Sequence, residues 1–182
     1  MNKIRQMSNG QFCLVQTVPT MLLNAAQSRI EEPQPPTWTD DNGNQYLNTE
    51  NPIYRAELTQ WEERRNEATI YAVALMGLSL CDEAGEPVPV PKDWDRDLRL
   101  LGVDWKEIAS RYFYTPKSGN IDSRVEEAVY IVLTCLRAKD MYLIGVCAGA
   151  SEEEVAKSIS SFQRAQERGP DSDAAHSEAD TN

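Results

Sequence analysis

The chain has 182 residues, with 29 acidic against 18 basic side chains, one histidine and a formal net charge of −11. Its length fits one domain of ordinary size, with a core that needs neither disulfides nor a metal to fold. The acidic balance argues against nucleic acid and anionic lipid as partners, because both require clustered lysine and arginine, and no basic run is longer than Arg64-Arg65.

Hydropathy and cysteine usage predict a cytoplasmic protein. The longest strongly apolar stretch, residues 70–81, is shorter than the roughly 20 residues that a membrane-spanning helix needs. The N-terminus carries two basic residues, but no apolar segment of adequate length follows, so we expect no signal peptide. The four cysteines form no CxxC pair, which is typical of reduced, buried thiols.

The N-terminal region predicts short elements. Residues 1–10 are polar, and we expect them to be frayed. Phe12–Val18 alternates loosely and is rich in β-branched residues, which favours a short strand. A short helix is predicted over Met21–Ile30.

A small hairpin is predicted next. Residues 31–37 hold three prolines, which forbid helix and favour an extended linker. Asn42-Gly43 is a strong signal for a type I′ turn. The flanking segments Thr37–Asp40 and Gln45–Asn48 are therefore expected to pair.

The clearest helix begins at Asn51-Pro52, because asparagine is a good N-cap and proline is pre-organised at the first helical position. From Ile70 onward it is apolar nearly all round, so this half should be central to the core, and we expect the helix to end near Cys81. Residues spaced by three and four trace one buried face: Tyr54, Leu58, Trp61, Arg65, Ala68, Ala72 and Leu75.

Proline-rich residues 86–91 should be an extended link to further helices. Lys92–Leu101 predicts a short helix with Trp94, Leu98 and Leu101 inward, closed by Gly102. Asp104 begins a capping box for a helix through about Tyr112.

Residues 115–120 are expected to form a loop, followed by a second capping box at Ser123. The helix behind it should break near Asp140 and resume through Val146. A third capping box at Ser151 predicts a last helix, Ser151–Phe162. In the helix that begins at Ser123, the inward face comprises Val125, Val129, Val132, Leu133 and Leu136.

Together these elements predict a mainly α fold: a compact helical domain over residues 11–168, with a small N-terminal β-hairpin or strand element. Residues 169–182 are expected to form a disordered acidic tail, and the segment Asp171–Asn182 carries −4 of the total charge. The only histidine, His176, lies in this tail. The predicted domain thus has no imidazole for a catalytic triad, a Cys–His pair or a histidine-based metal site.

The remaining reactive side chains are expected to be structural. Paired carboxylates such as Glu62-Glu63 and Glu126-Glu127 could serve acid–base chemistry, but solvated or capping glutamate is far commoner on helices. Cys135 and Cys147 lack a basic cluster that would activate a thiol. The glycine pair Gly145 and Gly149 lacks the features of a phosphate-binding loop. We therefore predict no enzymatic activity and no cofactor.

The aromatic run Tyr112-Phe113-Tyr114 is the candidate partner-binding site. Aromatic side chains dominate binding hot spots, so an exposed run would anchor a partner protein. The alternative is that the run packs its loop onto the core, as most aromatic residues do.

One arrangement resembles the tail assembly chaperones of long-tailed bacteriophages. It comprises the prolines at 33–36, the Asp41-Asn42-Gly43 turn, the Asn51-Pro52-Ile53-Tyr54 helix start, the Trp61–Arg65 stretch and a terminal Ser-x-Glu-Glu helix from Ser151. The resemblance covers residues 33–165. The segment at 12–30 is not part of it, and the family offers no catalytic residues to carry over.

The resemblance implies a non-enzymatic role in which the protein coats the tape measure protein in the host cytoplasm before the tail tube polymerises. The sequence leaves two alternatives open. One is a structural virion component, such as a neck or head–tail joining protein. The other is an acidic host-interaction protein, for which the 18 interspersed basic residues dilute any mimicry of DNA.

Overall fold

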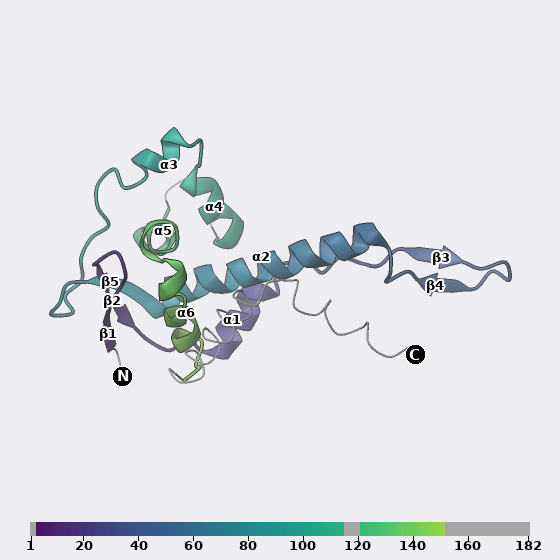
Figure 1. Ribbon diagram of the computed structural model, residues 1–182, viewed down its shortest axis with the longest axis horizontal. Helices are drawn as coiled ribbons and strands as arrows, with labels where there is room; N and C mark the ends of the chain where they lie inside the picture. Colours follow the sequence, from purple (N-terminus) through teal and green to yellow (C-terminus); the bar gives the residue numbers. More distant parts are fainter. Residues whose placement is uncertain (1–2, 115–120, 152–182) are drawn as a thin grey trace, which may run out of the picture.

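The structure is a computed structural model that describes residues 3–114 and 121–151. It is mainly helical, as predicted, with small sheets (Figure 1). The predicted loop at 115–120, the helix expected from Ser151 and the tail at 169–182 lie outside the described residues. In chain order the elements are β1 (Lys3–Gln6), β2 (Phe12–Val15), α1 (Thr20–Gln27), β3 (Thr37–Thr39), β4 (Gln45–Leu47), α2 (Pro52–Gly77), β5 (Leu78–Cys81), α3 (Arg96–Leu100), α4 (Trp105–Tyr112), α5 (Ser123–Tyr130), the π-helix η1 (Ile131–Cys135), the 3-10 helix η2 (Ala138–Asp140) and α6 (Tyr142–Cys147).

A three-stranded antiparallel sheet in the order β1-β2-β5 corrects two predictions. The expected frayed N-terminus is wrong from Lys3 onward, because Lys3–Gln6 pairs along β2 and the following Met7 is buried. The expected end of the long helix near Cys81 is also wrong. The helix ends at Gly77, because Leu78–Cys81 leaves it to pair with the other side of β2.

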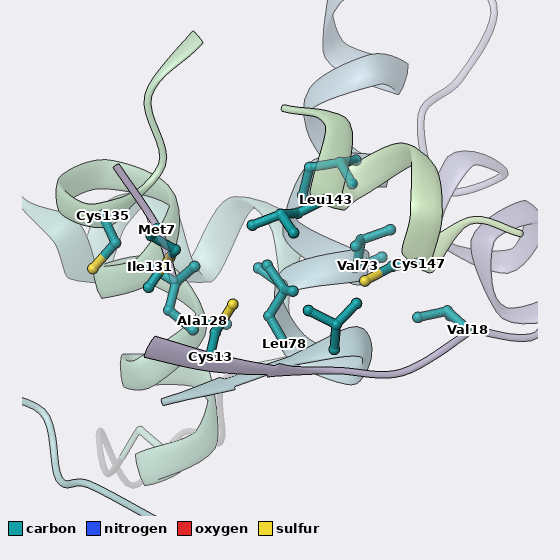
Figure 2. Close-up of a cluster of buried hydrophobic side chains, with 14 of the residues drawn as sticks. Met7, Cys13, Val18, Val73, Leu78, Ala128, Ile131, Cys135, Leu143 and Cys147 are labelled. Carbon is teal, nitrogen blue, oxygen red and sulfur yellow. The ribbon is translucent and has the colours of Figure 1, made fainter. Parts of the chain in front are cut away.

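The core gathers around the C-terminal half of α2, as its apolar sequence predicted. Val73 lies on this helix, Cys13 comes from the sheet, and Ile131 and Leu143 come from the later helices (Figure 2). All four are buried. Burial of such side chains contributes about 1.5–3 kcal/mol each, so this cluster is the main source of stability.

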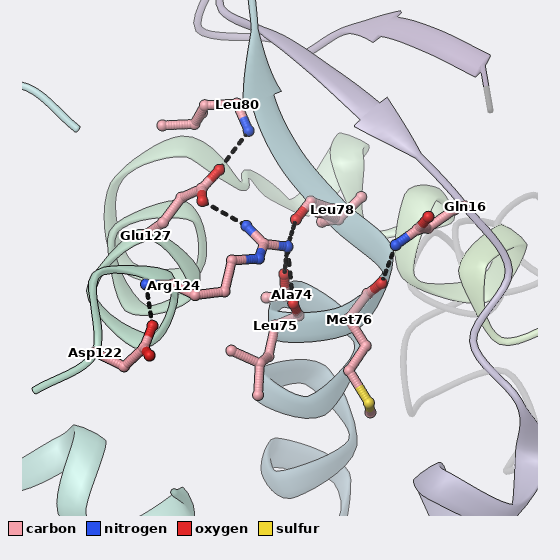
Figure 3. A network of polar contacts seen from close by, with 9 residues as sticks. All are labelled: Gln16, Ala74, Leu75, Met76, Leu78, Leu80, Asp122, Arg124 and Glu127. Carbon is pink, nitrogen blue, oxygen red and sulfur yellow. Dashed lines mark hydrogen bonds and ion pairs between the residues drawn. The ribbon is translucent and has the colours of Figure 1, made fainter. Parts of the chain in front are cut away.

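Arg124 ties the end of α2 to α5. Its guanidinium donates to the carbonyl oxygens of Leu75 at 2.7 Å and of Leu78, and pairs with Glu127 at 2.5 Å (Figure 3). Glu127 in turn accepts from the backbone N–H of Leu80 at 2.6 Å. These contacts satisfy carbonyls that the end of a helix leaves without a partner.

A second polar contact anchors the N-terminal strand pair. Asp140, which is buried, accepts from the backbone N–H of Ser8 at 2.9 Å, from the Ser8 hydroxyl and from the Arg137 N–H at 3.0 Å. Because the acceptor lies 132 positions along the chain from Ser8, this contact joins the two ends of the described fold.

Two local details differ from prediction. Leu101 points outward, at 79% exposure, because α3 is short and contributes no buried residue. The cap of α5 is Asp122 rather than Ser123, since the Asp122 carboxylate accepts from the Arg124 N–H. The predicted break near Asp140 comes slightly earlier, at Leu136 and Arg137, whose backbones are extended, and α6 resumes the helix through Val146 as predicted.

Candidate functional site

The first half of α2 and the β3–β4 hairpin project from the core as an arm, which we define as residues 31–67 (Figure 1). No residue of this arm is buried, although the predicted face of α2 is the less exposed one. The end of α1 and the residues just after it contact the middle of α2. Trp61 Nε1 donates to the Ile30 carbonyl at 3.1 Å, and an Arg65 N–H donates to Gln27 at 2.8 Å.

The extended link between α1 and the hairpin runs beside α2. It starts at Ile30, next to Trp61, and ends where the Pro36 carbonyl accepts from the Asn48 N–H at 2.7 Å. Prolines in this stretch set an extended backbone that spans about 3 Å per residue. The link therefore holds the hairpin at the far end of α2 without adding a helix of its own.

The hairpin carries an exposed aromatic pair. Trp38 and Tyr46 are cross-strand partners whose rings stack with centroids 5.0 Å apart. They remain 51% and 46% exposed. Two further apolar side chains of the arm, Leu47 and Ile53, are exposed as well. Because these rings pack on each other and not against the core, their exposed faces are available to contact another molecule.

Asp40 fixes the turn, which is not the predicted type I′. Its carboxylate accepts from the backbone N–H groups of Asn42 and Asn44 at 2.9 and 2.8 Å. Within this turn only Gly43 has a positive φ, whereas a type I′ turn needs a positive φ at both of its central residues. The hydrogen bonds, led by that from the Asn44 side chain, lower the pKa of Asp40, so this carboxyl stays ionised at neutral pH.

Both edges of the hairpin are open to pairing. The Asp40 N–H donates to the Asn44 carbonyl, and the Asn48 N–H donates to the Pro36 carbonyl. These two bonds show which cross-strand pairs of the hairpin are hydrogen-bonded. In an antiparallel pair every second residue directs its backbone groups outward. Those residues are Thr37, Thr39, Gln45 and Leu47. Among the described residues no third strand joins this sheet.

The arm is strongly acidic. Residues 31–67 contain nine acidic and three basic side chains, a net charge of −6. The stretch 31–50 has five acids and no base. Glu50, at the end of this stretch, forms an ion pair with Arg55 on α2, and both side chains are well exposed.

The predicted aromatic run divides between core and solvent. Tyr112 stacks on Tyr71 with centroids 4.6 Å apart, and its hydroxyl donates to Glu67. Phe113 meets the Tyr71 ring edge-on. Tyr114 is 79% exposed. The structure thus brings the first two onto the core, as the alternative interpretation expected, and only Tyr114 is placed to act as a surface anchor.

A cleft of about 650 Å³ lies between the proline-rich segment 88–91 and α4–α5. Trp94 forms part of its wall, with Nε1 donating to Glu126 at 3.1 Å and its ring near Trp105. Lys92 and Lys106 lie at the cleft beside acidic side chains. The cleft is thus lined by aromatic, charged and proline side chains, a mixture that suits the binding of a ligand.

The thiols and carboxylates of the described residues show no catalytic arrangement. All four cysteines are free and buried. Burial raises the pKa of Cys13 to about 12 and that of Cys147 to about 11, which is opposite to an activated nucleophile. Within residues 3–114 and 121–151, no group of His, Cys, Asp and Glu could hold a metal ion, and no helix has both the length and the hydropathy to cross a membrane.

Comparison with models of known protein families, with curated proteins and with solved structures finds no match.

The sequence interpretation missed the arm as a surface. It predicted the hairpin and the helix, yet selected Tyr112-Phe113-Tyr114 as the aromatic site. A usable signal was present, since Trp38 and Tyr46 face each other in the predicted hairpin within a stretch that has acids and no bases.

Proposed function

We propose that this protein acts by binding another protein, as a tail assembly chaperone that holds the tape measure protein of a long-tailed bacteriophage. The observation that carries the proposal is the arm, where Trp38, Tyr46, Leu47 and Ile53 are exposed on or beyond residues 52–67 of α2, a helical support of about 24 Å at 1.5 Å per residue. A chaperone needs such apolar contacts on a soluble carrier, and the acidic surface supplies the charge that limits self-association.

Several features support a binding role over an enzymatic one. Burial raises the pKa of the Cys13 and Cys147 thiols, and the cleft beside Trp94 is lined by aromatic and charged side chains that suit ligand binding. The Asn51-Pro52 helix start and the proline-rich link, which carry part of the family resemblance, both belong to the arm. Fold and resemblance therefore direct attention to the same part of the chain.

Co-expression with the tape measure protein of the same genome tests the proposal. We expect the tape measure protein to stay soluble and to co-purify with this chain, and to precipitate when this chain is omitted. A tape measure protein that is equally insoluble with and without this chain would refute the chaperone role.

A structural virion component is the second candidate, because a projecting arm also suits attachment to a neighbouring subunit. Mass spectrometry of purified particles separates the two functions. A stoichiometric amount of this chain in the particle favours the structural role, and its absence favours the chaperone.

A further inference from the structure

We propose that the arm adds an extended, basic segment of a partner protein as a third strand on the β3–β4 hairpin. The inference rests on the proposed function, because it names the chemistry of the partner bound by the same arm.

The open edges provide the hydrogen bonds. Thr37 and Thr39 on β3, and Gln45 and Leu47 on β4, direct backbone N–H and C=O groups outward, and all four residues are exposed. An extended peptide satisfies such groups by strand addition, which gives affinity through the main chain. The edges are short, and a two-stranded sheet alone is marginal in water, so a third strand also stabilises the hairpin.

The aromatic pair provides the apolar contact. Trp38 and Tyr46 lie on one face of the hairpin, and their stack extends across both strands. Side chains of an added strand alternate between faces, so every second residue of the partner would lie beside this stack. Aliphatic side chains of the partner would pack on this stack, as would the alkyl stems of lysine and arginine lying over the rings.

Charge selects the partner. Residues 31–50 carry five acids and no base, and hydrogen bonds hold the pKa of Asp40 low. A basic strand is attracted to this surface, whereas a second copy of the same hairpin would bring two acidic segments together. The arrangement thus favours a basic partner over pairing between arms.

The test uses the full chain and a fluorescein-labelled peptide of eight residues that alternates lysine and valine. The control peptide alternates glutamate and valine. We expect saturable binding of the lysine peptide in fluorescence anisotropy, weakened by salt, and binding of the glutamate peptide at least about tenfold weaker. In NMR spectra the backbone amides at 37–47 should shift, and those near Trp94 should not.

Two variants separate the contributions. Glu31→Lys/Glu32→Lys/Asp41→Lys reverses charge at exposed residues and leaves the Trp38–Tyr46 stack in place. It should reverse the preference between the two peptides. Trp38→Ala should weaken the lysine peptide about tenfold or more, as expected for a central aromatic contact. Leu101→Ala, which truncates an exposed leucine after α3, is the matched control and should leave binding unchanged.

Equal binding of both peptides, shifts confined to the Trp94 cleft, or concentration-dependent pairing of arms in analytical ultracentrifugation would each overturn the inference. The two proposals fail separately. A protein that binds the lysine peptide but leaves the tape measure protein insoluble refutes the chaperone role alone. One that keeps the tape measure protein soluble when its arm carries the three lysines refutes the basic-strand inference alone.

Discussion

At the scale of single residues, Gly77 shows how closely the core packs. A Cβ at this position would lie 2.9 Å from Val18 Cγ2 and 3.0 Å from the Cys147 side chain. These contacts join the last turn of α2 to the segment after β2 and to α6. The need for a glycine is therefore steric, and it arises from two segments that approach from either end of the chain.

Gly77→Ala should lower the free energy of unfolding by about 1–3 kcal/mol, the usual cost of overpacking a core. Urea denaturation followed by circular dichroism measures it. The double variant Gly77→Ala/Val18→Ala is the control, because removing the Val18 methyl groups makes room for the new one. A double variant that is no better than the sum of the single variants would contradict the steric explanation.

Buried thiols should be inert in the native protein. With pKa values of about 12 for Cys13 and about 11 for Cys147, almost no thiolate exists at pH 8. Labelling by a disulfide reagent should be at least about a hundredfold slower than for an exposed cysteine. In denaturant all four cysteines should react at once. A single cysteine that labels rapidly in native conditions would contradict the prediction and indicate a reactive site.

Asp140 should make stability depend on pH. Burial raises its pKa, but the hydrogen bonds from Ser8 and Arg137 lower it by more, so the folded-state pKa lies below the ordinary value of 3.8. Its stabilisation is therefore complete above pH 3.8 and is lost as the pH falls through the lower folded-state value. Asp140→Asn should cost about 1–3 kcal/mol at pH 7. Denaturation at pH 7 and at pH 3 should give a smaller difference from the native sequence at pH 3.

At the scale of elements, Arg124 determines how α2 ends. Its guanidinium contacts three backbone carbonyls there, those of Ala74, Leu75 and Leu78, and pairs with Glu127 beside them. Arg124→Ala should cost about 2–3 kcal/mol, since it leaves these acceptors without a charged donor. Arg111→Ala is the matched control. It removes an arginine from an exposed pair with Glu107 at 3.4 Å, and should cost less than about 0.5 kcal/mol. Equal costs would contradict a special role for Arg124.

Elements specified by local chemistry could be predicted from the sequence, and elements specified by distant partners could not. The Asn51 cap with Pro52 defines the start of α2, and Gly43 marks the turn of the hairpin. β1 and β5 are different, because each becomes a strand only through pairing with β2. The apolar run Leu78–Cys81 reads equally well as helix, since hydropathy alone does not separate a buried strand from a buried helix.

The candidate site follows the same rule. The residues of the arm were predicted as elements, yet their exposure depends on where the core ends. Trp38 and Tyr46 stay exposed because the hairpin sits beyond the core, whereas Tyr112 is covered because α4 packs beside Tyr71. Such placement is tertiary information, and no local spacing contains it.

At the scale of the whole molecule, the chain separates a stable core from an arm that adds little to stability. The core surrounds the second half of α2, and residues 52–67 of the same helix contribute no buried side chain. Opening of the arm therefore exposes little apolar surface, and local opening free energies follow such burial.

Hydrogen exchange should reveal this division, with two antiparallel strand pairs compared inside one molecule. Amides of the β3–β4 hairpin should exchange at least about a hundredfold faster than those between β2 and β5, because the hairpin strands are exposed and β5 is largely buried. Adding the lysine–valine peptide should slow exchange at residues 37–47 and leave β2 unchanged. Hairpin amides as protected as those of Cys13 in the free protein would show that the arm is covered, for instance by a second copy, and would contradict both the division and the open edge.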